Sequence, residues 1–243
     1  MNVISYGGGW QTVAMLALVA KGVLERPDRI VTADTSREVG STWAYLNDTM
    51  QPFLEQHGMR VEVAPRDLAT VDLYGKNGDL LLPVYTATGK FSTYCSNEWK
   101  SRVIDRYLRG HGIESATRWI GFALDERSRW NKPEDDGAWK RRFPLVELLV
   151  TKADCPKIIA SVGLPFPHKS RCWQCPHQTN AEWRELPPDE FEKACLLDEQ
   201  IREDDEYHAV YLHQSRVPLR SADLNARDRN EPNRQCGLGL CMI

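Results

Sequence analysis

Residues 3–12 read "VISYGGGWQT", and the order of residue types in this stretch indicates the architecture of the whole chain. A short run rich in β-branched residues comes first, three consecutive glycines follow, and the apolar stretch "VAMLALVAKG" continues to residue 22. The spacing of the apolar residues predicts a strand over 2–6 and a helix over 11–22 that Gly22 ends. Glycine is the costliest residue to order, so the cluster indicates a backbone that approaches a ligand closely. We expect that ligand to be a phosphate.

The same alternation of strand and helix continues toward the middle of the chain. The sequence predicts strands over 29–34, 60–65 and 117–124, and helices over 41–58 and 96–112. This order predicts an α/β fold with a doubly wound, mostly parallel sheet of five or six strands and helices on both faces. Ligands of such sheets bind beyond the carboxyl ends of the strands.

Two stretches depart from this alternation. Residues 74–93 carry three glycines and no clear period, so we expect a long loop near the ligand site. Residues 125–142, "DERSRWNKPEDDGAWKRR", are polar, and we expect a mobile loop there. A helix around 151–162 follows.

The stretch "GLPFPHKSRC", residues 163–172, breaks regular structure and indicates a domain boundary. We expect a nucleotide-binding domain over 1–165 and a small helical, Cys-rich region over 166–243. Within the second region the sequence predicts helices over 180–203 and near 206–214, followed by a polar tail.

Composition narrows the class of protein. The chain has 243 residues, 42% of them hydrophobic and 27% charged, and a formal net charge of −3, which argues against a globally basic nucleic-acid binder. No apolar run approaches the roughly 18 residues of a membrane span, and the start "MNVISYGGG" lacks the features of a signal peptide. The seven Cys cluster as "CWQC" and "CGLGLC", which favours metal ligation by thiolates over disulfides. We therefore expect a cytoplasmic protein without a membrane partner.

The glycine stretch matches neither common nucleotide-binding fingerprint. It lacks the Lys of G-x-x-x-x-G-K-[ST] and the spacing of G-x-G-x-x-G. Its backbone N–H groups and the start of the following helix can surround an anion, with the hydroxyls of Ser5 and Thr12 as further donors. The alternative is a tight turn that binds nothing.

The stretch "SYGGGWQT" resembles the PP-loop of the adenine nucleotide alpha hydrolase superfamily, the N-type ATP pyrophosphatases, whose usual form is S-G-G-x-D-S. In this chain Gly7 stands for the Ser, Gln11 for the Asp and Thr12 for the second Ser. The resemblance implies a Rossmann-like HUP domain that binds ATP or phosphoadenosine phosphosulfate (PAPS). The loop residues that it assigns to the nucleotide are Ser5, Gly7, Gly8, Gly9, Gln11 and Thr12. With the Asp lost, how a magnesium ion would be held is open.

Further motifs resemble those of PAPS reductases: "TADTSRE" with Ser36 where Gly is usual, "YCSNEWKSRVIDRYLR" and "IGFALDERSRW". With "FPLVELL" and the Cys motif, the chain resembles, over nearly its whole length, a group of bacterial and phage proteins with PAPS reductase-like domains. The resemblance implies nucleotide contacts from Asp34, Thr35 and Gly121. It implies catalytic roles for Lys100, Cys95 and Arg127, with Arg129 as another cation that can neutralise phosphate or sulfate oxygens.

Two pairs of cysteines suggest a four-thiolate metal site. Cys172 and Cys175 form C-x-x-C, and Cys236 and Cys241 lie five residues apart near the end of the chain. Spacing alone leaves zinc and a 4Fe–4S cluster open, and resemblance to adenylylsulfate reductases and DNA phosphorothioation proteins favours the cluster. Cys95 is either a ligand beside three of these thiols or a reacting thiol beside all four, and we favour the second.

Two other cysteines lie in helical patterns. We predict that Cys155 and Cys195 are small core residues.

Taken together, the motifs lead us to expect an enzyme with a PP-loop and a 4Fe–4S cluster that adenylates a nucleobase or nucleic acid for sulfur transfer. The basic residues 140–142, "KRR", are candidates for nucleic-acid contact. A sulfur donor such as a cysteine desulfurase, and a homo-oligomer or a larger complex, are the expected partners. One alternative is a sulfonucleotide reductase that works with thioredoxin, Cys236 or Cys241 being its nucleophile. The other is a non-catalytic, nucleotide-binding or zinc-stabilised subunit.

Overall fold

The computed structural model describes residues 1–65, 73–130, 137–204 and 209–228. Their internal contacts divide the chain into two compact units, one of Met1–Asp72 with Ser96–Arg171 and one of Leu73–Cys95 with Cys172–Ile243. Within the described residues, no helix is both long and apolar enough to cross a membrane.

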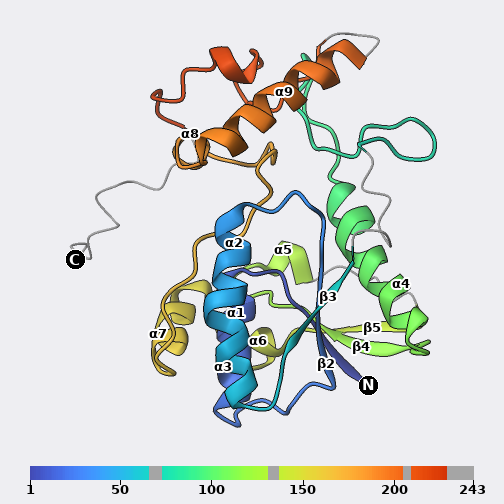
Figure 1. Ribbon diagram of the computed structural model, residues 1–243, viewed down its shortest axis with the longest axis vertical. Helices are drawn as coiled ribbons and strands as arrows, with labels where there is room; N and C mark the ends of the chain where they lie inside the picture. Colours follow the sequence, from blue (N-terminus) through green and yellow to red (C-terminus); the bar gives the residue numbers. More distant parts are fainter. Residues whose placement is uncertain (66–72, 131–136, 205–208, 229–243) are drawn as a thin grey trace. The chain divides into compact units, whose positions relative to one another are not determined.

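The first unit contains a five-stranded, wholly parallel sheet (Figure 1). Its strands are β1 Asn2–Ser5, β2 Arg29–Ala33, β3 Val61–Ala64, β4 Ala116–Trp119 and β5 Trp139–Arg142. They lie in the order β3-β2-β1-β4-β5, so β1 pairs with β2 on one side and with β4 on the other. The chain reverses its winding direction at β1, which makes a Rossmann-like sheet with its switch point there. The predicted α/β fold is confirmed.

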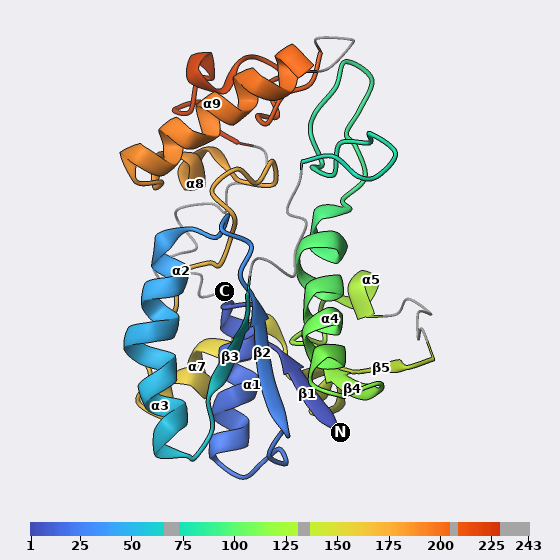
Figure 2. The same ribbon diagram turned by 45° about the vertical axis from the view of Figure 1, so that its right-hand side comes forward.

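Helices cover both faces of this sheet (Figure 2). They are α1 Trp10–Ala20, α2 Gly40–Tyr45, the π-helical turn η1 Leu46–Met50, α3 Gln51–Gln56, the π-helical turn η3 Asn97–Ser101, α4 Arg102–Gly110, α5 Arg127–Trp130, α6 Pro144–Glu147, the 3-10 turn η4 Lys152–Asp154 and α7 Cys155–Ala160.

The core forms as two apolar clusters, one on each face. Because side chains alternate along a strand, Ile4 of β1 packs with α1, α3 and α7, while its neighbour Val3 packs with α4. In β2, Ile30 belongs to the same cluster as Ile4, and Val31 belongs to the same cluster as Val3. The continuous apolar runs of these strands follow from burial on both faces.

The fifth strand lies where we expected a mobile polar loop, so that prediction is wrong for residues 139–142. β5 lies at the edge of the described sheet, beside β4. Edge strands tolerate charged side chains, and "WKRR" has a single large apolar residue, the buried Trp139. The sequence of β5 therefore carries no alternating apolar pattern that would identify it.

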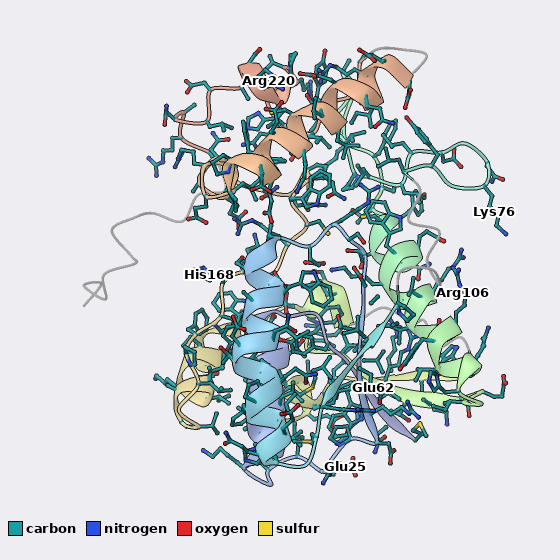
Figure 3. All side chains as sticks on the ribbon, viewed as in Figure 1. Glu25, Glu62, Lys76, Arg106, His168 and Arg220 are labelled. Carbon is teal, nitrogen blue, oxygen red and sulfur yellow. The ribbon has the colours of Figure 1, made fainter. Side chains whose placement is uncertain are left out.

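The second unit combines two separate segments of the chain. Tyr85 N–H donates to Tyr211 O at 2.8 Å and Tyr211 N–H donates to Tyr85 O at 2.9 Å, which joins the segments. The helices here are α8 Asn180–Arg184, α9 Pro188–Asp204 and the 3-10 turn η5 Leu219–Ser221. Arg220 of this turn, labelled in Figure 3, forms ion pairs with Glu192 and Glu199 of α9.

Both helix predictions in this unit need correction. The helix expected over 180–203 is interrupted before α9, where two prolines, Pro187 and Pro188, remove consecutive N–H donors. The helix expected near 206–214 is absent from described residues 209–214. The fully buried Asp198 carboxylate instead accepts the N–H groups of Leu212 and Leu219, both at 2.8 Å, and holds this stretch against α9.

Candidate functional site

The glycine loop, residues 6–9, connects the end of β1 to the start of α1. Gly8 has φ +68°, and a Cβ there would lie 2.6 Å from Cγ2 of Thr42. A side chain at this position would therefore meet both backbone strain and a steric clash. A Cβ at Gly7 would meet nothing within 4 Å.

The backbone N–H groups of the loop and of the first turn of α1 lack acceptors among the described residues. Within the described residues, the backbone N–H groups of residues 7–12 have no hydrogen-bond acceptor, and the first one that is accepted is Val13 N–H, by Gly9 O at 3.1 Å. No side chain caps the start of α1. The loop amides and the positive end of the helix dipole are thus available to an anion.

A cavity of about 240 Å³ opens beside this loop, within the first unit. Its walls come from the glycine loop, the end of β2, the start of α2, the stretch from Ser96 to Ile104, and the stretch from Arg118 to Arg129. It therefore lies at the carboxyl ends of β1 and β2, beside the switch point where such sheets bind ligands.

Three cations line the cavity, and salt bridges pair each with a carboxylate: Lys100 with Glu38, Arg118 with Asp105, and Arg129 with Glu126. Of the described acidic residues, only Glu38 lines the cavity itself. The cavity wall therefore carries an excess of positive charge, and the carboxylates hold the cations in place for an anionic ligand.

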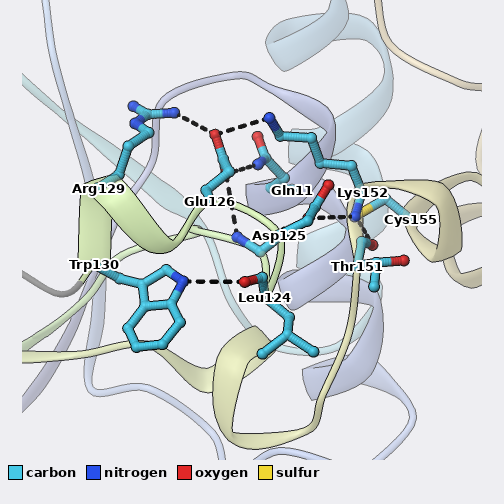
Figure 4. A network of polar contacts seen from close by, with 10 residues as sticks. Gln11, Leu124, Asp125, Glu126, Arg129, Trp130, Thr151, Lys152 and Cys155 are labelled. Atoms are coloured by element: carbon cyan, nitrogen blue, oxygen red, sulfur yellow. Dashed lines mark hydrogen bonds and ion pairs between the residues drawn. The ribbon is translucent and has the colours of Figure 1, made fainter.

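Glu126 is the centre of a polar network behind the loop (Figure 4). Its buried carboxylate accepts hydrogen bonds from Nε2 of Gln11, from Ala123 N–H at 3.2 Å and from Arg129 at 2.7 Å, and it pairs with Lys152 at 3.2 Å. Burial acts to raise the pKa of Glu126, but the bonds from Arg129, Ala123 and Lys152 outweigh it, and the pKa is lowered. An ionised Glu126 thus anchors both the first turn of α1 and the cavity cation Arg129.

Gln11, which stands where the resemblance would place the PP-loop Asp, is therefore committed to Glu126 and does not line the cavity. Magnesium prefers carboxylate and water oxygens, and an amide held by a carboxylate is a poor substitute. The loop residue that the resemblance would assign to magnesium does not fit that ion.

Gly121 and Thr12 lie against each other, and neither lines the cavity. A Cβ at Gly121 would lie 3.0 Å from Thr12 Oγ1 and 3.1 Å from Thr12 N, so a larger residue would press on the start of α1. Glycine at this position keeps the β4–α5 stretch close to the loop.

Asp34 and Thr35 shape the turn after β2. The Asp34 carboxylate accepts Ser36 N–H at 2.7 Å, and the fully buried Thr35 hydroxyl accepts Arg37 N–H at 3.2 Å. Ser36 has φ +52°, a left-handed conformation that glycine adopts without strain. Neither Asp34 nor Thr35 lines the cavity, although Ala33 does.

The three predicted catalytic residues lie in different places. Lys100 lines the cavity, whereas Arg127 is exposed on α5 and does not. Cys95 belongs to the second unit, where its N–H donates to Leu81 O at 3.1 Å.

Cys172 and Cys175 lie in the second unit, in a turn in which Cys175 N–H donates to Cys172 O at 3.1 Å. Neither thiol forms a disulfide with another described residue, and both are partly exposed. Cys236 and Cys241 lie outside the described residues. Among the residues that the structure describes, no three or more His, Cys, Asp or Glu side chains are grouped to hold a metal, so Cys95 does not complete such a group with this pair.

Cys155 and Cys195 are core residues, as predicted. Burial raises the pKa of each thiol to about 11, so neither is a reactive thiolate near neutral pH.

The basic stretch 140–142 is largely engaged within the protein. Arg142 pairs with Glu25 and Glu147 and lies 4.6 Å from the centre of the Trp119 ring. Lys140 is exposed. Most of the charge that we expected to contact nucleic acid is thus already balanced or partly covered.

Sequence reasoning missed Glu38 and Arg118 in the cavity and the role of Glu126. One signal for Arg118 was available, because it is a single cation at the start of the otherwise apolar "RWIGFAL" stretch of a predicted strand. The Glu38–Lys100 pair joins residues 62 positions apart, and nothing local indicates it.

No protein-family model matches this chain, and no curated protein matches it. Among solved structures, the chain is similar to the U34-tRNA thiolase NcsA from Methanococcus maripaludis, which carries a 4Fe–4S cluster, with 14% identity and a TM-score of 0.41 over 85% of this chain and 67% of that chain. Similarity at this level concerns the fold alone, and the α/β assignment above stands on the strand order of the sheet itself.

Proposed function

We propose that this chain is an enzyme that binds ATP at the glycine loop and adenylates a substrate for sulfur transfer. The observation that carries the proposal is the run of N–H groups from Gly7 to Thr12, which have no acceptor within the described residues. Such groups at the start of a helix suit phosphate oxygens. The choice of an adenine nucleotide comes from the PP-loop resemblance.

The cavity cations supply the electrostatic part of the reaction. When a substrate oxygen attacks the α-phosphorus, a new P–O bond forms, the bond to the β-phosphate oxygen breaks, and pyrophosphate leaves with that electron pair. Negative charge builds on the phosphates during this step. Lys100 and Arg129, held by Glu38 and Glu126, and the loop amides stabilise that charge. No step here depends on magnesium, because Gln11 does not fit that ion.

The second unit supplies the proposed metal centre. Cys172 and Cys175 provide two thiolates from one turn, and Cys236 and Cys241 provide the other two, for a 4Fe–4S cluster or a zinc ion. When bound, a cluster supplies a place for sulfur to be held or delivered. Cys95 remains our candidate for a reacting thiol, and a nucleobase or nucleic acid remains our candidate acceptor, with a cysteine desulfurase as sulfur source.

Product analysis tests this assignment directly. Anaerobic protein incubated with ATP, candidate RNA or DNA and a sulfide source should release pyrophosphate, and Lys100→Met should reduce the rate by about 100-fold or more, because it removes a cation from the cavity. Exposed Lys76→Met, in the second unit, is the matched control. Sulfite release from PAPS or adenylylsulfate with thioredoxin would instead assign a reductase. No pyrophosphate and no sulfite would leave a non-catalytic subunit.

A further inference from the structure

A serine that is far from the glycine loop in sequence lies directly beside it in the fold. A Cβ at Gly9 would lie 3.3 Å from Oγ of Ser170, and a Cβ at Gly8 would lie 3.5 Å from Cβ of Ser170. Ser170 and the loop belong to the same compact unit. Figure 3 labels His168, two residues before this serine. The stretch that we predicted to be a domain boundary therefore forms part of the wall around the loop.

Two hydrogen bonds to α2 and its N-cap hold the stretch around Ser170 in place. Val39 N–H donates to Arg171 O at 2.9 Å, directly after the serine. The Tyr45 hydroxyl donates to Pro165 O at 2.7 Å, at the other end of the stretch. Ser170 is thus positioned by its backbone neighbours, and its side chain is not needed for that placement.

The hydroxyl of Ser170 is available to a ligand. It forms no hydrogen bond with another described residue, and the side chain is partly buried. It does not cap the nearby start of α1, where the first N–H groups lack acceptors within the described residues. A serine that only supported the fold would be expected to bond to those groups.

The hydroxyl and the loop amides are close enough to bind one anion. A Cβ lies about 2.5 Å from the backbone N of its own residue, so Ser170 Oγ lies no more than about 5.8 Å from Gly9 N. Hydrogen bonds from both kinds of donor are about 3 Å long. A phosphate group between the two donors can therefore accept from both.

The position of Ser170 along the loop indicates which phosphates it meets. The cavity is lined by Gly7 and Gly8 but by neither Gly9 nor Ser170. In the proposed function the α-phosphate reacts beside the cations of this cavity. The phosphates beyond it then lie outside the cavity, along Gly9 and the start of α1, where the hydroxyl is.

We propose that Oγ of Ser170 donates a hydrogen bond to the phosphates beyond the α-phosphate, and so favours nucleotides that carry a pyrophosphate tail. This inference rests on the proposed function and adds a binding residue to it. The hydroxyl holds the part of the nucleotide that leaves as pyrophosphate, whereas the cavity cations act on the α-phosphate.

Calorimetric titration of the full-length chain with ATP and with AMP tests this inference. Ser170→Ala should bind ATP at least about 10-fold more weakly, because a hydrogen bond to a charged phosphate is lost. Its affinity for AMP should stay within about 2-fold of the parent's, because AMP lacks the phosphates that the hydroxyl contacts.

Ser115→Ala is the matched control. Ser115 is exposed and forms no hydrogen bond with another described residue. It directly precedes β4, whereas the glycine loop follows β1, and the two strands are parallel. Ser115 therefore lies at the opposite end of the sheet from the loop, and S115A should bind both nucleotides as the parent chain does.

Melting without nucleotide separates a binding role from a structural one. S170A should melt at the same temperature as the parent chain and S115A, because the hydroxyl makes no bond within the described protein. At equal ATP concentration, the melting temperature should rise less in S170A than in the parent chain, since stabilisation follows affinity.

The outcomes separate this inference from the proposed function. If the parent chain binds no ATP, the proposed function fails and the inference fails with it. If the parent chain binds ATP and S170A binds it with the same affinity, the inference alone is overturned. Equal losses for ATP and AMP, or nucleotide-free S170A melting below S115A, would overturn it too.

Discussion

The glycine loop and the C-x-x-C turn both present hydrogen-bond donors that the described protein leaves unpaired, but they do so differently. In the loop the donors are backbone N–H groups from Gly7 to Thr12, positioned by a strand and a helix that neighbour it in sequence. In the turn the donor is one side chain, Gln174, and the thiols beside it are half of the four-thiolate set that we propose. The first arrangement needs only local backbone, whereas the second, as we propose it, also needs thiolates from outside the described residues.

The largest expected effect is on metal binding at the C-x-x-C turn. Cys172→Ser should abolish metal binding in the anaerobically purified chain, because a four-thiolate centre loses one ligand. Cys195→Ala, which changes a buried thiol outside the motif, should leave metal content unchanged. Iron, acid-labile sulfide and zinc analyses check both variants. Equal metal content in C172S and the parent chain would contradict the proposal that the C-x-x-C turn binds a metal.

The next effect tests the loop. Gly8→Ala should weaken ATP binding by about 10-fold or more, because the added Cβ meets Thr42 and strains a backbone with φ +68°. Gly22→Ala is the matched control, since Gly22 has φ +72° and open space around its Cβ. Both variants should lose stability from the left-handed backbone, and calorimetric titration should show that only G8A loses affinity. Equal ATP affinity in G8A and G22A would contradict the loop's role.

The smallest effect concerns the network behind the loop. Glu126→Gln should lower the free energy of unfolding at neutral pH by about 2 kcal/mol, because charged hydrogen bonds to Arg129 and Lys152 are lost. The folded pKa of Glu126 is lowered, so its contribution is present above the unfolded pKa and disappears as pH falls through the folded pKa. Urea unfolding should therefore show a shallower acid dependence for E126Q.

The ion pair of exposed Glu25 with partly buried Arg142 provides the control for this variant. Glu25→Gln should change the free energy of unfolding by less than about 1 kcal/mol at neutral and at acidic pH, because solvent screens the pair. An E126Q chain that unfolds with the parent's stability and acid dependence would show that Glu126 does not anchor the loop.

The sequence predicted the sheet well where local pattern and burial agree. The first three strands and α1 are apolar runs bounded by glycine or polar residues, and they were found within a few residues of their observed ends. β5 was missed because an edge strand needs little apolar surface. The helix expected near 206–214 failed because the buried Asp198 carboxylate accepts N–H groups from Leu212 and Leu219, a contact that no local pattern indicates.

The glycine loop of the candidate site could be predicted from the sequence, whereas most of the ion pairs around the cavity could not. The three glycines indicated the loop, although the positive φ and the close approach that require glycine occur together at Gly8 alone among them. Lys100, which lines the cavity, followed from a motif. Glu38 was not assigned a role because its partner Lys100 is 62 positions away. Arg129 is only three residues from Glu126, but the bond that ties Glu126 to the loop comes from Gln11, 115 positions away. Which charged side chains pair with each other depends on the folded structure, so local sequence does not indicate these pairs.

Hydrogen exchange at the loop, with and without ATP, tests the central claim most directly. The amides of residues 7–12 should exchange fast in the free protein and slow strongly when ATP binds, while the turn at Gly58 exchanges equally in both. Amides already protected without nucleotide, or unchanged with both ATP and PAPS, would contradict the account.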